Sequence, residues 1–295
     1  MVGFCIILFK GCYVRNSPAE NNILITLYLH EQNKTIKLKL EEYIIGTVAA
    51  EMPASFELEA LKAQAVSART YALKRILGNV KYPLGADLSD DINSCQAYIS
   101  PEDFKQKHGN KSDEYLNKIT RAVVETKGET MVCDGQPIDA LYHSTCGGQT
   151  ESAAEVWQKD VPYLTTVNCK YCSQSKHFST VQVFSVSELN GLTGDGNCNQ
   201  IKIKVLEKTT SGRIKKLSVN NNLLTGEKFR NLLNLPSNWW QYEIINNQLV
   251  INSRGYGHGV GMCQFGADGM AKEGKKYRDI LRHYYTNIEF YKIGY

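Results

Sequence analysis

Glu51 lies at the end of a predicted helix, two residues before a proline. Apolar residues recur at helical spacing from Leu40 to Val48, and the run stops at Glu51-Met52-Pro53, since the residue before a proline is pushed out of helical geometry. A carboxyl at the C-terminal end of a helix lies at the negative end of the dipole, which disfavours its ionised form. Such a group could hold its proton near neutral pH and act as a general acid. The alternative is a glutamate that simply faces solvent.

A second set of residues has the spacing of metal ligands. Two residues separate His143 from Cys146, and two separate Cys169 from Cys172. Two such pairs supply the four nitrogen and sulfur ligands of a tetrahedral structural zinc site. Three alternatives stay open: a disulfide from Cys169 to Cys172 or to Cys146, free thiols with His143 in an active site, or a hydrolase with Cys146 as nucleophile and His143 as base.

A third segment, Ser253 to Ala267, carries a glycine at every second position from Gly255 to Gly261. We exclude a dinucleotide-binding loop, because no βαβ pattern surrounds the segment and no acidic residue is suitably placed. Glycines also let a backbone approach a ligand or another chain segment closely. The segment would then present His258 and Gln264 at its edge; the alternative is a tight structural loop.

These residues must be positioned by helices and strands that the pattern also predicts. Asn21–Leu40 alternates as a hairpin, a helix follows from Leu40 to Glu51, and a second helix has Ser55 as N-cap and ends at Gly78. Further along we expect a charged helical segment from Pro101 to about Thr126, strands at 181–183, 201–206 and 217–219, and a helix over Tyr277–Tyr285. The fold class is α+β in one main domain, with short helices at the corner that bears Glu51, packed on mixed β structure.

Composition excludes some classes of protein. The net charge of +4 is too small and too evenly spread for a nucleic-acid surface, so no nucleic-acid partner is expected. No apolar run reaches the roughly 18 residues of a spanning helix. The short apolar run from Met1 to Cys12 predicts that residues 1–20 are the remnant of an export signal or an anchor. Nine cysteines leave at least one thiol unpaired or bound to metal if the protein is exported.

Taken together and in order, three segments resemble the SpoIID (stage II sporulation protein D) family, which includes the LytB-like amidase enhancers. They are Glu42–Leu73, Tyr142–Leu164 and Gly255–Tyr285. The sporulation branch consists of lytic transglycosylases, and the resemblance places their catalytic glutamate at Glu51. It also implies that residues 21–295 form a peptidoglycan-cleaving domain, in which Tyr142, His143, His258 and Gln264 line the glycan cleft.

The resemblance further implies an exported protein of the cell envelope that acts on peptidoglycan glycan strands. Its chemistry needs no cofactor, so any zinc on the cysteine set would be structural. Some family members hold a metal near the position of Cys95, but Leu88–Gln96 supplies one cysteine and no histidine here. The alternative function is a non-catalytic peptidoglycan-binding enhancer whose partner is a cell-wall amidase.

Overall fold

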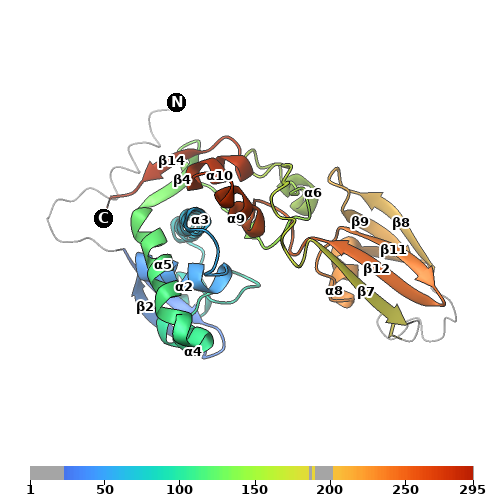
Figure 1. Cartoon of the computed structure of the whole chain (residues 1–295), viewed down its shortest axis with the longest axis horizontal. Helices are drawn as coiled ribbons and strands as arrows, with labels where there is room; N and C mark the ends of the chain where they lie inside the picture. The colour runs from blue at the N-terminus through green and yellow to red at the C-terminus, as the bar shows by residue number, and fades with distance from the viewer. Residues whose placement is uncertain (1–22, 186–187, 190–201, 295) are drawn as a thin grey trace. The chain divides into compact units, whose positions relative to one another are not determined.

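The computed structural model describes residues 23–185, 188–189 and 202–294 (Figure 1). The chain divides into two compact units: unit 1 is Met1–Leu141 with Ala271–Tyr295, and unit 2 is Tyr142–Met270. Each unit combines helices with small sheets, so the predicted α+β class is confirmed. The export or anchor segment predicted for residues 1–20 lies outside the described residues. Among the described helices, none has both the length and the apolar character that a membrane crossing requires.

Unit 1 begins with the predicted hairpin, β1 (Leu24–Leu29) paired antiparallel with β2 (Lys34–Lys39). Helix α2 (Leu40–Glu51) follows and ends at Glu51, as the proline two residues later predicts. Helix α3 (Leu58–Leu77) has Gly78 as its C-cap, so the predicted end is confirmed. The predicted N-cap at Ser55 is wrong: Glu57 takes that position, because a turn in which the N–H of Phe56 binds the carbonyl of Pro53 delays the helix start.

Helix α3 is the centre of unit 1. It contacts α2, α5 (Ser112–Glu125), α10 (Tyr277–Tyr284) and β4 (Glu129–Cys133), and Figure 1 shows it nearly end-on among these neighbours. The fully buried Arg69 binds both carboxylate oxygens of Glu41 at 2.8 and 2.7 Å and the carbonyl of Glu129 at 3.0 Å. A buried guanidinium needs such a bidentate partner, so this pair fixes α3 against α2.

The charged segment predicted from Pro101 to Thr126 is two helices. Helix α4 (Pro101–His108) is separated from α5 by a short 3-10 turn, η2 (Gly109–Lys111). Gly109 ends α4 because its φ of +53° is a conformation that glycine adopts most readily. The predicted C-terminal helix is α10. The remaining elements of unit 1 are η1 (Pro83–Gly85), β3 (Leu88–Ser89), which joins β1, and β5 (Gln136–Pro137) and β14 (Glu289–Lys292), which flank β4.

Unit 2 contains two antiparallel three-stranded sheets. One has the order β11-β12-β7 and the other β10-β9-β8, with the predicted strands found at β7 (Ser179–Ser185), β8 (Ile203–Lys208) and β9 (Ile214–Val219). Their shared core includes Phe229, Trp240 and Ile251. The other described elements are β6 (Tyr142–His143), α6 (Ala153–Trp157), β10 (Asn222–Thr225), α8 (Gly226–Leu232), β11 (Trp240–Ile245), β12 (Gln248–Arg254), β13 (Met262–Cys263) and α9 (Gln264–Lys272), whose last two residues belong to unit 1.

Candidate functional site

Glu51 is the last residue of α2, and its half-buried carboxyl is held in place by the backbone of a distant segment. Its Oε1 accepts a hydrogen bond of 2.7 Å from the N–H of Ala97. The helix end was predictable from the sequence, whereas a partner 46 residues away was not. The bond orients the carboxyl, which is what a proton-transferring group requires.

The segment that binds Glu51 crosses α2 closely. The N–H of Ile99 donates to the carbonyl of Gly46 at 3.3 Å, and a Cβ at position 46 would clash with the ring of Tyr98. That ring stacks on Tyr43 with centroids 6.0 Å apart. A glycine inside a helix is unfavourable by about 1 kcal/mol relative to alanine, so Gly46 is the sequence signal that another segment approaches here.

A polar pocket of about 680 Å³ adjoins this segment within unit 1. Its walls come from the β1–β2 turn and from two stretches of the chain between β3 and α4. Ala97 is one of the lining residues, which places the backbone that holds Glu51 in the pocket wall. The other walls carry His30, Asp90 and Ser100, so the pocket suits a hydroxyl-rich ligand.

Tyr142, His143 and His258 come together in unit 2. Strand β6 pairs in parallel with β13, and the Nε2 of His258 donates to the carbonyl of Tyr142 at 3.1 Å. The N–H of Val260 donates to Nδ1 of His258, while Nδ1 of His143 donates to the carbonyl of Val260, both at 3.1 Å. The two imidazole centroids are 5.6 Å apart.

Burial keeps both imidazoles neutral. Desolvation lowers the pKa of His143 well below its ordinary value, and it lowers the pKa of His258 to about 4. Gln264 is 6% exposed and begins α9. Glu51 belongs to unit 1, and the other four predicted residues belong to unit 2. The substrate-binding role of those four residues stays a prediction.

The alternating glycines allow the chain to approach β6 closely, as predicted. Gly255 and Gly257 have φ values of +82° and +108°. A Cβ on Gly257 would lie 3.0 Å from Cβ of His143, and one on Gly255 would lie 2.6 Å from the carbonyl oxygen of Thr145. Side chains at these positions would push the two segments apart.

Four buried cysteines form a cluster in unit 2. The sulfur atoms of Cys146, Cys169, Cys172 and Cys263 all lie within 4.8 Å of one another. Three of them belong to the predicted metal set, but the fourth position is taken by Cys263 and not by His143. The ring of His143 is turned toward Val260 instead. Sequence reasoning missed Cys263 because it lies 117 residues from Cys146 and has no neighbouring cysteine to form a ligand pair.

The cluster fits a structural zinc ion. A tetrahedron with Zn–S bonds of 2.3 Å has sulfur atoms about 3.8 Å apart, and the sulfurs of Cys146 and Cys172 are 3.5 Å apart. The N–H groups of Cys146 and Gly266 each donate to Sγ of Cys263 at 3.3 Å, and such bonds favour thiolate ligands. All six cysteines of the described residues are free thiols.

The charge state of the cluster also suits a cation. Hydrogen bonds from Cys146 and the other two thiols lower the pKa of Cys172, whereas burial raises the pKa of Cys263. Four buried thiols therefore cannot all ionise by themselves. A divalent cation would stabilise the four thiolates together, because thiols bind zinc in the deprotonated form.

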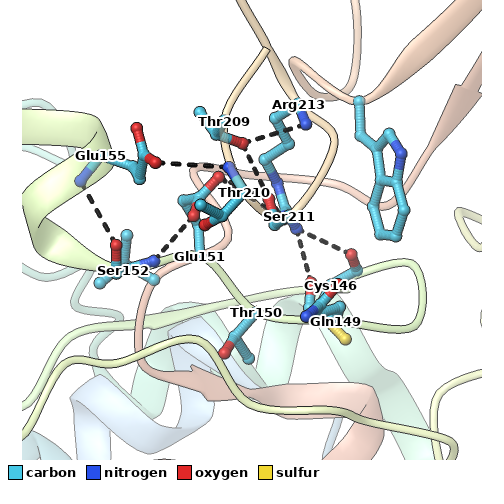
Figure 2. Close-up of polar contacts among 12 residues, drawn as sticks. Cys146, Gln149, Thr150, Glu151, Ser152, Glu155, Thr209, Thr210, Ser211 and Arg213 are labelled. Atoms are coloured by element: carbon cyan, nitrogen blue, oxygen red, sulfur yellow. Dashed lines mark hydrogen bonds and ion pairs between the residues drawn. The ribbon is translucent and has the colours of Figure 1, made fainter.

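A buried ion pair lies beside the cluster (Figure 2). Glu151 and Arg213 are 4.0 Å apart, and Ser211 bridges them with hydrogen bonds of 2.5 Å to Glu151 and 2.7 Å from Arg213. Arg213 also donates to the carbonyls of Cys146 and Gln149 at 2.9 and 2.8 Å. Figure 2 shows its guanidinium pointing toward both residues. The turn between β8 and β9 is thereby tied to the chain that carries Cys146.

Comparisons with known proteins identify the family of this chain. The family model described as "SpoIID: Stage II sporulation protein" matches residues 28–133, which include Glu51 and the residues that line the adjoining pocket. Stage II sporulation protein D of Bacillus subtilis (strain 168) is 36% identical over 272 residues, covering 90% of this chain and 78% of the relative. The same-named protein of Bacillus amyloliquefaciens is 34% identical over 92% of this chain and 79% of its own length. The chain belongs to the SpoIID family.

A more distant relative carries a different name. A protein of Bacillus subtilis (strain 168) named amidase enhancer is 26% identical, over 81% of this SpoIID-family chain and 39% of the relative. The family model lies entirely within unit 1, whereas the alignments with the two sporulation proteins extend over both units. Unit 2 is therefore a part of the protein that those relatives share.

Proposed function

We propose that this SpoIID-family protein is a lytic transglycosylase that cleaves the glycosidic bond between N-acetylmuramic acid and N-acetylglucosamine in peptidoglycan strands. The observation that carries the proposal is the carboxyl of Glu51 at the end of α2. It is fixed by the N–H of Ala97, and Ala97 lines a polar pocket. Membership of the SpoIID family supports the same chemistry.

Glu51 acts first as an acid and then as a base. The protonated carboxyl gives its proton to the glycosidic oxygen as the bond from C1 of the muramic acid breaks. The resulting carboxylate takes the proton from the 6-hydroxyl of the same sugar, whose oxygen bonds to C1 and closes a 1,6-anhydro ring. No water is consumed, and Glu51 ends protonated as it began. A second carboxylate of the kind that paired glycosidases use is unnecessary.

The test is digestion of purified glycan strands, with and without stem peptides, by wild type and Glu51→Gln. We expect anhydro-ended fragments from the wild type, and a rate lower by about 10²–10⁴-fold for Glu51→Gln, read by mass spectrometry. Glu114→Gln is the matched control, because it makes the same substitution in the exposed first turn of α5. Equal rates for Glu51→Gln and wild type would contradict the assignment.

An amidase-enhancing binder is the second proposal, favoured by the relationship to the protein named amidase enhancer. It is supported if wild-type protein cleaves neither substrate but accelerates a cell-wall amidase. Both proposals place the protein outside the cytoplasmic membrane, in the cell envelope where peptidoglycan lies. Antibody labelling of intact and permeabilised cells would check this location.

We also propose that Cys146, Cys169, Cys172 and Cys263 hold one structural zinc ion. The support is the mutual distance of the sulfurs and the N–H donors on Cys263. Metal analysis should find one zinc per chain in the wild type and a clear loss in Cys172→Ser. Cys133→Ser is the control, since Cys133 lies in β4 of unit 1 and outside the cluster. Equal zinc in all three proteins, or none in any, would refute the site.

A further inference from the structure

A second pocket lies in unit 2. Its lining includes none of the residues to which the resemblance assigns a role. Its volume is about 460 Å³, within the range of about 300–1,000 Å³ that small-molecule sites occupy. It lies between the first residues of β7, the C-terminal end of α8 and the chain at Tyr256. The side chains that matter are those of His177, Gln182, Arg230, Asn231, Asn234 and Tyr256.

Tyr256 offers an exposed aromatic face at the mouth of this pocket. Its side chain is 46% exposed, and the ring of His177 packs behind it at 4.5 Å between centroids. Two hydrogen bonds with Thr145, of 2.7 and 3.1 Å, fix the backbone of Tyr256. Burial lowers the pKa of His177, so the aromatic pair is uncharged at neutral pH. A rigid, exposed tyrosine of this kind stacks well on a sugar ring.

Arg230 gives the pocket a positive charge. Glu227, three residues earlier on α8, interacts with it electrostatically but forms no salt bridge with it. The Nε of Arg230 donates to the carbonyl of Leu235 at 3.1 Å, which holds the half-buried side chain in place. Within residues 23–185, 188–189 and 202–294, no ion pair joins Arg230 to a carboxylate. A partly buried guanidinium favours a planar anion that can accept two hydrogen bonds, and a carboxylate has that geometry.

Polar atoms complete the lining. Thr180 contributes a hydroxyl-bearing side chain to the lining, and Gln182 contributes an amide. The amides of Asn231 and Asn234 add both donors and acceptors.

We propose that this pocket binds an N-acylated amino sugar that carries a carboxylate, with its ring on Tyr256 and its carboxylate on Arg230. The identity of the ligand rests on the proposed function, since the lactyl group of muramic acid supplies such a carboxylate on a glycan strand. The pocket would therefore hold a strand by a sugar other than the one that reacts.

The cysteine cluster positions both aromatic residues of the pocket. Thr145, which pairs with Tyr256, immediately precedes Cys146. Oγ of Ser175 lies 2.7 Å from Oγ1 of Thr145 and accepts the N–H of His177 at 3.1 Å. Ser175 in turn closes a turn whose first carbonyl is that of Cys172. The two rings are thus anchored to segments that carry ligands of the proposed zinc site.

The experiment measures binding by the full chain in the Glu51→Gln background, so that no ligand is cleaved. The probes are the soluble disaccharide of N-acetylglucosamine and N-acetylmuramic acid, and chitobiose, which lacks the carboxylate. Calorimetry should show that Arg230→Gln lowers the affinity for the acidic disaccharide by about 10–100-fold, the usual value of a charged hydrogen-bonded pair. The affinity for chitobiose should not change. Lys228→Gln, which removes the same charge from the same helix, should change neither affinity.

Tyr256→Ala should weaken both sugars, and Tyr256→Phe should bind both as the wild type does, because the ring is kept. Equal affinity for the two sugars, or an acidic disaccharide that Arg230→Gln binds as tightly as wild type, would overturn the proposal. The cleavage assay is independent of these results. Failure to cleave with Arg230-dependent binding would overturn the transglycosylase alone, whereas cleavage without that dependence would overturn the pocket alone.

Discussion

In unit 1 the carboxyl of Glu51 is positioned by the end of one helix and one backbone N–H. In unit 2, side chains from distant segments hold the structure together: four buried thiols, and the Glu151–Arg213 pair beside them. The first arrangement depends on helix geometry, which neither metal nor mild acid alters. The second depends on charged and sulfur-bearing groups, so the stability of unit 2 should respond to both.

Metal removal should separate the two units most strongly. Removing the proposed zinc with a chelator would leave four buried thiols without a cation, and we expect unit 2 to lose on the order of 5 kcal/mol or more of stability. Hydrogen exchange with mass spectrometry can assign the effect to its unit. Amides of β6, β13 and the 169–175 loop should lose protection, while those of α3 keep theirs. An equal loss of amide protection in α3 would contradict the idea that only unit 2 depends on metal.

The buried ion pair is the next test. Glu151→Gln leaves the guanidinium of Arg213 buried without its anion, and we expect urea denaturation to show a loss of about 3–5 kcal/mol. Glu155→Gln is the matched control, because Glu155 pairs with the more exposed Lys215 at 3.3 Å. That pair should contribute less than about 1 kcal/mol. Similar losses for both variants would mean that burial does not distinguish them.

Mild acid should weaken unit 2 through His258. The pKa of His258 is about 4 when folded and 6.5 ordinarily, so between these values the unfolded chain binds a proton that the folded chain does not. The free energy of unfolding therefore falls as pH drops from about 6.5 to 4, by about 3 kcal/mol in total. His258→Gln should have a shallower pH dependence in denaturation curves than wild type. Parallel curves would exclude His258 as the cause.

The smallest expected effect concerns two serines of unit 1. Ser100 caps α4, with its hydroxyl accepting the N–H of Asp103 at 3.0 Å, so Ser100→Ala should lower the unfolding free energy by about 1 kcal/mol. Ser55 precedes α3 without capping it, and Ser55→Ala should change stability by less than about 0.5 kcal/mol. A larger loss at Ser55 in thermal denaturation would contradict the observed start of α3.

Local patterns predicted the local elements. Period-two alternation predicted the β1–β2 hairpin, and Glu51-Met52-Pro53 predicted the end of α2, because both depend on neighbouring residues alone. The paired cysteine spacings identified three of the four clustered thiols. Cys263 could not be found in this way, since only the pairing of β6 with β13 brings it to the others.

Non-local polar contacts were equally out of reach. The bond from Ala97 to Glu51 and the pairing of Glu151 with Arg213 join residues 46 and about 60 positions apart. No periodicity reports such a contact, because it arises when separate elements pack. The glycine-rich segment was the partial exception: Gly257 marked a place where another segment passes close by, although the pattern did not say which one. Gly46 carries the same signal but was not part of the sequence-based prediction.

Unit 1 is discontinuous in the chain: its last helix and strand, α10 and β14, follow the whole of unit 2. Strand β14 pairs with β4, and the N–H of Tyr277 binds a carboxylate oxygen of Glu59 on α3. A ribosome delivers these residues only after unit 2 has been synthesised. The N-terminal part of unit 1 therefore cannot complete its packing until the whole of unit 2 has been synthesised. An exported chain would face the same delay a second time, during its passage through the translocation channel.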